Sequence, residues 1–385
     1  MTHNDPSKVM QSAPGAYTII GGRQYLYFVG TGYLGLHGHP EVLRAACEAT
    51  EKYGMGSATS RRGFGNTPPT LDVEARAAEF FGKDDAMYFM TGYLGNSVLV
   101  QGLAGTFDLV AVDESSHYSV MDAAVLSQRP IVKFANRNPE SLAAVLAEHC
   151  TDGKRPLVIT DGVFPVRGII APVDGYYRAL KPYAGSALMV DDAHALGAVG
   201  PTGRGSLEHA GLPWETVNTN VQPDGAPRLF VSGTLSKAFG AYGGIVPGSA
   251  DFIDALKADS PYYRAASALP PANAAASAKA FELVRDHPEM LQRLRDNVKL
   301  LRDGLRGLGL DVDDSLVPII CLVLDTVERM KQVQAELMEQ GILIAYNPKY
   351  SDLGPKGGIR IAVFATHTKE MIQRLIDGVA KVLAV

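Results

Sequence analysis

Residues 187–194 read ALMVDDAH and residues 228–240 read RLFVSGTLSKAFG. Each stretch opens with a short, almost continuous apolar run and then turns polar, the first at Asp191 and the second at Ser232. Apolar runs of this length predict strands that are buried on both faces, as in a parallel sheet covered by helices. The two stretches therefore indicate an α/β fold, and each places polar side chains where a strand ends.

The same alternation extends along the chain from these two stretches. Amphipathic segments at 119–128 and 139–150 separate the apolar runs and predict helices. The predicted strands are 86–92, 109–114, 130–135, 156–164, 187–194 and 228–234. We therefore expect a large domain with a mostly parallel sheet and helices on both faces.

The last third of the chain has a different pattern. Residues 266–308 predict one or two long helices. Shorter elements follow, with strands expected at 319–325, 342–347 and 358–365 and helices near 329–340 and from Lys369. This pattern predicts a smaller α+β C-terminal domain. We expect residues 1–44 to form an N-terminal arm and a segment that packs with the small domain, 45–250 the large domain, and 251–385 the small domain.

Composition excludes several classes of protein. Lys and Arg number 36 and Asp and Glu 41, a net charge of −5, which argues against a dedicated nucleic-acid binder. No apolar run approaches the roughly 20 residues of a membrane span, and the first fifteen residues lack the regions of a secretory signal. Cys47, Cys150 and Cys321 are widely spaced and predict buried, reduced thiols. We therefore expect a cytoplasmic protein that binds neither nucleic acid nor a membrane.

Reactive side chains follow several predicted strands. The carboxyl ends of parallel strands meet at one edge of a sheet, where ligands bind. Residues 86–92 lead through Gly92 into a helix, whose N-terminal N–H groups suit an anion. The other polar residues at strand ends are His117, Asp191, His194, Thr234 and Lys237.

This set suits pyridoxal 5′-phosphate (PLP). PLP needs a lysine amine to bond to its aldehyde and a carboxylate to keep its pyridine nitrogen protonated. Each residue also has an ordinary interpretation: Lys237 as a solvated lysine, His117 as a core histidine, Asp191 and His194 as turn caps. A zinc or iron site built from the acid and the two histidines would leave the lysine and the glycine turn unexplained, so we expect no metal.

The sequence resembles the fold-type I PLP enzymes of the class I/II aminotransferase superfamily, and within them the α-oxoamine synthase family. That family includes 8-amino-7-oxononanoate synthase, 2-amino-3-ketobutyrate CoA ligase and serine palmitoyltransferase. The resemblance runs from about Arg23 to the C-terminus and implies a seven-stranded sheet in a PLP-binding large domain, residues 45–250. It rests on RQYLYFVGTGYLGLHGHPEV (23–42), GMGSATSRRGFGN (54–66), MTGYLGN (90–96), DESSHYSV (113–120), TDGVFPVRGIIAPV (160–173), VDDAHALGAVGPTGRGS (190–206), SGTLSKAFGAYGG (232–244) and RIAVFATHT (360–368).

The resemblance implies four catalytic residues that also bind the cofactor. Lys237 would bond to the PLP aldehyde and later move a proton. Asp191 would pair with the pyridine nitrogen, and His194 would hydrogen-bond the ring hydroxyl. His117 would stack on the ring.

Further residues are implied to bind the phosphate and the substrate. Gly92 and Tyr93 would give backbone N–H groups to the phosphate, together with the Thr234 hydroxyl. Ser267 of a partner subunit would reach the same phosphate, which implies a homodimer. Arg360 would grip the substrate carboxylate, because a guanidinium binds a carboxylate with two parallel hydrogen bonds.

The sequence departs from the family pattern around the substrate. The family usually has Asn-Asp-Tyr-Leu-Gly or similar where this sequence reads TGYLG (31–35), so an amide near the substrate carboxylate is missing at Gly32. Pro165 replaces a serine whose hydroxyl would lie near the ring hydroxyl. Arg167 adds a charge that would bind a second carboxylate or a phosphate, or else pair with an acid such as Asp161. The residues that hold the cofactor are unchanged.

The expected activity is that of a PLP-dependent transferase acting on an α-amino acid and a second small molecule. The family implies C–C bond formation between the amino acid and an acyl thioester. Other PLP reactions stay open: β- or γ-elimination or replacement, C–C bond formation with a non-CoA partner, reaction of a sulfonium amino acid, and transamination. A scaffold protein that kept the fold without the cofactor is a further alternative. The sequence names neither substrate.

Overall fold

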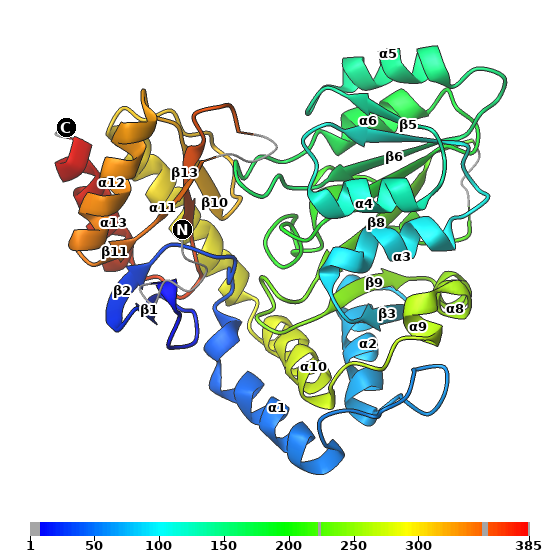
Figure 1. Cartoon of the computed structure of the whole chain (residues 1–385), viewed down its shortest axis with the longest axis horizontal. Helices are drawn as coiled ribbons and strands as arrows, with labels where there is room; N and C mark the ends of the chain where they lie inside the picture. The colour runs from blue at the N-terminus through cyan, green and yellow to red at the C-terminus, as the bar shows by residue number, and fades with distance from the viewer. Residues whose placement is uncertain (1–7, 222–224, 349–352, 384–385) are drawn as a thin grey trace.

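The computed structural model describes residues 8–221, 225–348 and 353–383. Its main feature is a seven-stranded sheet in which β9 runs antiparallel to both of its neighbours and the other strands run parallel (Figure 1). This arrangement confirms the predicted fold class. Across the sheet the strands are β3 Asp85–Phe89, β9 Gly244–Gly248, β8 Arg228–Thr234, β7 Ala187–Asp191, β6 Pro156–Asp161, β4 Leu109–Asp113 and β5 Ile131–Phe134.

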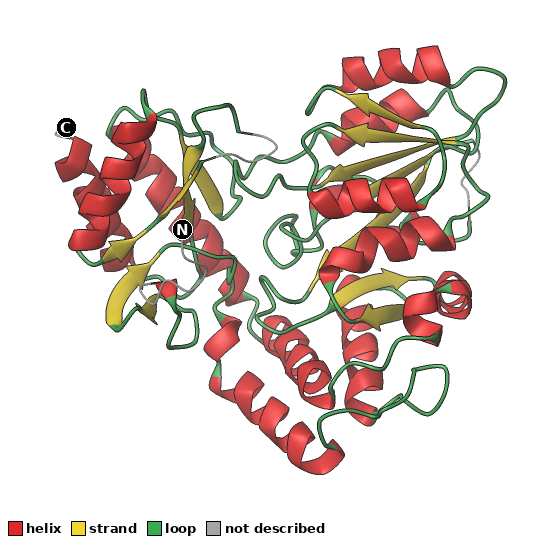
Figure 2. Cartoon of the chain, in the orientation of Figure 1, coloured by secondary structure: helices red, strands yellow, loops and turns green. Residues whose placement is uncertain are grey.

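Helices cover both faces of this sheet (Figure 2). Leu157 and Ile159 of β6 pack with α3, α4 and α8, whereas Val158 between them packs with α5, α6 and α7. Successive strand residues thus enter opposite cores, which is why the strands are apolar throughout. The helices of this part are α2 Pro68–Phe81, α3 Gly95–Gly102, α4 Tyr118–Leu126, α5 Pro139–His149, α6 Val173–Leu180, α7 Ser206–His209, α8 Ala250–Asp259 and α9 Pro261–Arg264.

The smaller part of the molecule combines described segments from the N-terminal and the C-terminal parts of the chain, as Figure 1 shows. Strand β2 near the N-terminus pairs in parallel with β11, with Leu26 opposite Ile342. This part is the predicted smaller α+β domain. Its strands are β1 Tyr17–Ile20, β2 Arg23–Tyr27, β10 Ile319–Leu322, β11 Ile342–Leu343, β12 Ala345–Asn347 and β13 Gly358–Ala362, and its helices are α11 Glu289–Gly307, α12 Val327–Glu339 and α13 Lys369–Leu383.

Two long helices, α1 Pro40–Tyr53 and α10 Pro271–Asp286, lie between the two parts. They pack against each other, and α10 also packs against α2. Helix α8 packs on strand β3 of the large sheet and on helix α3. The division of the chain at residues 44 and 250 stays a prediction.

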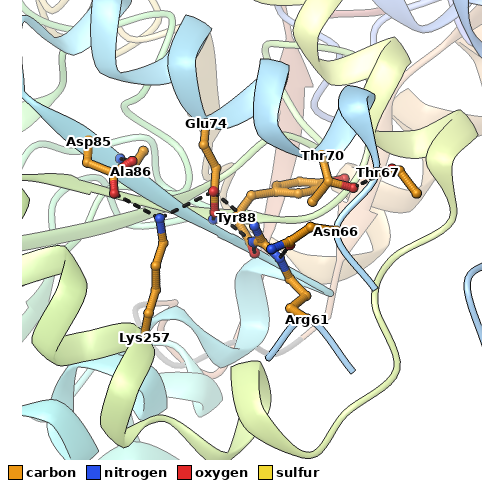
Figure 3. A network of polar contacts seen from close by, with 9 residues as sticks. All are labelled: Arg61, Asn66, Thr67, Thr70, Glu74, Asp85, Ala86, Tyr88 and Lys257. Atoms are coloured by element: carbon orange, nitrogen blue, oxygen red, sulfur yellow. Dashed lines mark hydrogen bonds and ion pairs between the residues drawn. The ribbon is translucent and has the colours of Figure 1, made fainter. Parts of the chain in front are cut away.

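A buried ionic network fixes the loop between α1 and α2 (Figure 3). The Arg61 guanidinium donates to both carboxylate oxygens of Glu74, at 2.6 and 2.9 Å, and to the Tyr88 carbonyl at 2.9 Å. Lys257 reaches the same Glu74 carboxylate at 3.3 Å and that of Asp85 at 2.8 Å. Paired and hydrogen-bonded charges of this kind hold loop, helix and strand in one arrangement.

The three cysteines are free thiols, but the prediction that all of them are buried is wrong. Cys47 is exposed because it lies on the polar face of α1, whose buried side is formed by Val42 and Ala49. Cys150 and Cys321 are partly exposed. Within the described part of the chain, no helix is both long enough and apolar enough to span a membrane.

Candidate active site

The polar residues predicted at strand ends meet at one edge of the large sheet. Gly92 follows β3, His117 follows β4, Asp191 ends β7 and Lys237 follows β8. Gly92 lies directly against Thr234, since a Cβ at Gly92 would fall 2.3 Å from the Thr234 Cβ. The turn before α3 therefore touches the end of β8, and only a residue without a side chain fits there.

The Asp191 carboxylate is held by several donors. Its Oδ2 accepts a hydrogen bond from Asn96 Nδ2 at 2.6 Å and lies 3.3 Å from Ser119 Oγ. Its Oδ1 accepts the backbone N–H of Ala193 at 3.0 Å. Donors on both oxygens fix the orientation of this buried carboxylate.

His117 caps the N-terminus of α4. Its backbone N–H donates to Asp161 Oδ2 at 2.7 Å, and its Nδ1 accepts the backbone N–H of Ser119 at 3.2 Å. In the neutral ring the hydrogen therefore sits on Nε2. Burial lowers the pKa of His117, and the nearby Asp191 charge partly opposes this effect. The ring stands edge-on to Tyr93, with centroids 5.8 Å apart.

Two further acids lie beside Asp191. Burial raises the pKa of Asp161 well above its usual value, and the charge of Asp191 adds to that shift. Burial also raises the pKa of Asp192 to about 7, even though Ser206 donates two hydrogen bonds to its carboxyl. A Cβ at Gly162 would fall 1.8 Å from Asp192 Oδ1, so this loop needs glycine.

Lys237 has the properties of a reactive amine. Burial lowers its pKa to about 8, partly opposed by Asp191 and Asp161, while Arg360 lowers it further. Among the residues that the structure describes, the Lys237 amine makes no hydrogen bond or ion pair. A lysine of this kind is partly uncharged near neutral pH and so is a nucleophile.

His194 is hydrogen-bonded to Tyr33, a residue of the segment between β2 and α1. The Tyr33 hydroxyl lies 2.8 Å from His194 Nδ1. Burial raises the pKa of Tyr33 to about 12, against the effect of the nearby Arg360. Burial lowers the pKa of His194 well below its usual value, and Lys237 adds to this shift. A neutral imidazole faces a neutral phenol.

Arg360 on β13 reaches into the same region from the small domain. Its Nε donates to the Pro165 carbonyl at 2.9 Å and its Nη1 to the Gly30 carbonyl at 2.8 Å. Its Nη2 is buried and has no hydrogen-bond partner of good geometry among the described residues, although the Tyr33 hydroxyl lies close to the guanidinium. A buried cationic donor without an acceptor is costly, so this edge of the guanidinium is suited to an anionic ligand.

The segment 30–37 also contacts the turn that bears the lysine. His37 Nε2 lies 3.2 Å from the Ser236 carbonyl. The His37 ring fills the space beside Gly32, because a Cβ at Gly32 would fall 3.0 Å from His37 Nδ1. The residue that replaces the family amide is therefore packed against an imidazole.

The other predicted residues differ in how the structure places them. The backbone N–H of Tyr93 donates to Thr91 Oγ1 at 3.4 Å, and its exposed side chain donates to Asp122 at 2.6 Å. Arg167 is exposed on the loop after β6, and Ser267 is exposed and forms a strand bridge with Ser60.

Several residues of this site were not assigned a role by sequence reasoning. Asn96, Ser119, Tyr33 and His37 all lie inside the motifs that carry the resemblance. The available signal was position: Asn96 lies in the first turn of the helix after β3, and Ser119 in the first turn after β4. In the described ranges, no cluster of three His, Cys, Asp or Glu side chains is arranged to hold a metal ion.

Comparison with known proteins gives one family. The family described as aminotransferase class I and II matches residues 31–379. An 8-amino-7-oxononanoate synthase of Methylococcus capsulatus is 36% identical over 376 residues, which cover 97% of this chain and 93% of the relative. The same enzyme of Symbiobacterium thermophilum is 35% identical over 379 residues, covering 98% and 93%.

Solved structures agree with this match. The serine palmitoyltransferase of Sphingomonas wittichii superimposes with a TM-score of 0.87 at 26% identity, covering 98% of this chain and 92% of that one. A structure described as SPT with PLP gives a TM-score of 0.86 at 26% identity, covering 98% and 91%.

Proposed function

Because the chain belongs to the aminotransferase class I and II family, we propose that it is a PLP-dependent transferase that joins an α-amino acid to an acyl thioester through a new C–C bond. One observation carries this proposal. An amine of lowered pKa, a fixed carboxylate and a guanidinium with an unpartnered Nη2 lie together at one sheet edge. The reaction class is that of the relatives named above.

The residues of the site fit PLP. The close approach of Gly92 to Thr234 places the start of a helix beside a hydroxyl, which suits the phosphate group. Asp191 would pair with the pyridine nitrogen, His194 with the ring hydroxyl, and Lys237 with the aldehyde. When bound, PLP accepts electrons from the α-carbon of the amino acid.

The protein's own side chains orient the reactants and move the proton. Asn96 holds Asp191 so that its charge stays in place, and a nearby carboxylate favours a protonated nitrogen. The Lys237 amine takes or gives the α-proton at its Nζ, since its pKa of about 8 lies near the working pH. Arg360 orients the substrate carboxylate through Nη2, while two carbonyls hold the rest of its guanidinium.

We also propose a cytoplasmic homodimer. The Ser267 hydroxyl is exposed and lies on the stretch that the family uses to reach a neighbouring subunit's phosphate. Free cysteines agree with a reducing compartment. Light scattering of the PLP-loaded protein should show twice the mass of the chain at micromolar concentration, and a stable monomer would contradict the dimer.

The function is tested by following the α-carbon. The PLP-loaded protein is incubated in D₂O with glycine, alanine, serine and larger amino acids, and mass spectrometry detects deuterium at the α-carbon. Acyl-CoA is then added and the ketone product is sought, with Lys237→Ala as the control. Ketone formation supports the proposal. A keto acid instead indicates transamination, and loss of a side-chain group indicates elimination or replacement.

A further inference from the structure

Ser119 connects His117 and Asp191, two of the groups proposed to contact the cofactor. Its Oγ is 2.8 Å from His117 Nδ1 and 3.3 Å from Asp191 Oδ2. Resting on the proposed function, we propose that Ser119 is a positioning residue that turns its hydroxyl hydrogen between the imidazole and the carboxylate. The charge state of His117 would in this way control how many donors Asp191 receives.

The Ser119 hydroxyl has a single hydrogen to donate. When His117 is neutral, Nδ1 already accepts the backbone N–H of Ser119, so this nitrogen is an acceptor and the hydroxyl donates to it. Asp191 Oδ2 is then left with the Asn96 amide at 2.6 Å as its main donor.

A proton on the imidazole reverses this arrangement. Nδ1 then carries a hydrogen and donates to Ser119 Oγ, the backbone N–H of Ser119 loses Nδ1 as its acceptor, and the hydroxyl hydrogen turns to Asp191 Oδ2. The added proton stays on the imidazole and the serine keeps its own hydrogen, so no covalent bond to Ser119 forms or breaks. Both hydrogen bonds of this state involve a charged group, and such bonds are the stronger kind.

The geometry favours this exchange because the Ser119 hydroxyl is buried and held in place. The Ser119 side chain is buried, and Asn96 Nδ2 lies 3.4 Å from its Oγ, which helps to keep the oxygen in place. The charged or titratable groups that face His117 come from several elements. They are Asp161 on β6, Asp191 on β7, His194 after β7, Lys237 after β8, Tyr93 before α3, and Tyr118 and Asp122 on α4 itself.

The consequence is that the hydrogen bonding of the Asp191 carboxylate depends on the charge of His117. A positive imidazole beside the cofactor site adds a donor to the carboxylate and withdraws part of its charge from the position proposed for the pyridine nitrogen. A neutral imidazole returns that charge. Through Ser119, the negative charge that Asp191 presents to the proposed position of the pyridine nitrogen thereby depends on the charge of His117.

The experiment measures the His117 ring directly. Histidine labelled with ¹³C in the ring is incorporated into the full-length chain, and NMR titration follows its resonances with and without PLP. His117→Asn assigns the signal among the nine histidines. Because the hydroxyl stabilises the charged ring more than the neutral one, Ser119→Ala should lower the pKa of His117 by roughly 0.5–1 unit. Ser119→Cys, with similar volume and a weak donor, should give a shift in the same direction.

A matched control removes a buried hydroxyl elsewhere. The Ser186 hydroxyl donates to the Leu180 carbonyl just before β7 begins, at the opposite edge of the sheet. Ser186→Ala should leave the pKa of His117 unchanged. An unchanged pKa in both Ser119 variants, or an equal shift in Ser186→Ala, would overturn the proposal. The titration needs no substrate, so its outcome is separate from the identity of the reaction.

Discussion

Asp161 and Asp191 stand opposite each other on the adjacent parallel strands β6 and β7. Both carboxyls are buried, yet their partners differ: Asp161 accepts the backbone N–H of His117, whereas Asp191 is held by Asn96. Two neighbouring carboxyls in a buried site do not readily both carry charge, and the pKa of Asp161 is raised well above its usual value, mainly by burial. Burial and the neighbouring carboxyl therefore both favour the neutral form of Asp161.

Asp161→Asn should remove a pH dependence of stability. A buried acid with a raised pKa binds more protons in the folded state than in the unfolded state, so stability falls as pH rises above about 4, by up to about 1.4 kcal/mol per pH unit. The amide keeps an acceptor for the His117 N–H and cannot titrate. Urea unfolding of the PLP-free protein between pH 4 and 8 should show the variant gaining relative stability with pH. A constant difference between the two proteins, or the same change in the surface variant Asp254→Asn, would contradict this assignment.

Lys237→Ala should abolish covalent attachment of PLP while the fold is kept. In the wild-type protein, capture of PLP should speed up as pH rises towards 8 and then level off, because the neutral amine reacts and the pKa of Lys237 is lowered to about 8 by burial. Absorbance after borohydride reduction measures the bond, and circular dichroism measures the fold. Lys279→Ala, on α10, is the control, and a chromophore in the Lys237 variant that borohydride reduces and fixes to the protein at the wild-type level would refute the role.

Asp191→Asn should reduce turnover far more than PLP affinity. The amide oxygen can still accept from Asn96, but the charge that favours a protonated pyridine nitrogen is lost. We expect turnover to fall roughly a hundredfold, the size of effect seen when one electrostatic contact to a transition state is removed. Equilibrium dialysis of PLP should change by less than tenfold. Equal losses in both measurements would indicate a structural role only.

Gly32→Ala should destabilise the protein through His37. The new Cβ would lie 3.0 Å from His37 Nδ1, and overpacking of this kind typically costs about 1–3 kcal/mol. His37→Ala removes the obstacle, so the double variant should lose less stability than the sum of the two single variants. Thermal unfolding of the wild type, the two single variants and the double variant gives the interaction free energy between the two substitutions. Strict additivity would show that the two residues do not interact.

Arg360→Lys should weaken binding of the amino acid but not of PLP. The guanidinium is held by the carbonyls of Pro165 and Gly30, and its Nη2 is left for the ligand; one ammonium cannot satisfy all three sites. A lost hydrogen bond to a charged group is worth about 1.5–3 kcal/mol, so KM should rise roughly 10- to 100-fold. An unchanged KM with a reduced kcat would place the substrate carboxylate elsewhere.

The strands that carry the site were predictable because they are apolar throughout. The predicted strand 228–234 coincides with β8, and the predicted run 187–194 turns polar at Asp191, where β7 ends. Strand β9 was missed. Its sequence, GIVPG, contains two glycines and a proline, which weaken any strand signal, and its place between β3 and β8 depends on pairing with distant residues.

The side chains around the cofactor position were only partly predictable. Lys237 and Asp191 stand out because each follows an apolar run in a family motif. The hydrogen bonds of Asn96 and Tyr33 could not be predicted, because their partners lie 95 and 161 residues away in the chain. Pattern and spacing show which residues share an edge of the sheet, but a hydrogen bond between distant segments follows only from the folded arrangement.

The bond from Arg360 to the Gly30 carbonyl joins two segments that leave the ribosome at opposite ends of translation. The N-terminal segment also pairs through β2 with β11, and the Tyr27 carbonyl is bonded to His367. These contacts too can form only after the C-terminal part of the chain has been synthesised. Apart from Ser267 of the partner subunit, the residues proposed to hold PLP have all been synthesised once Lys237 is made, whereas Arg360, the proposed anchor for the substrate, has not. The arginine proposed to select the amino acid is therefore synthesised long after the lysine proposed to bond to the cofactor.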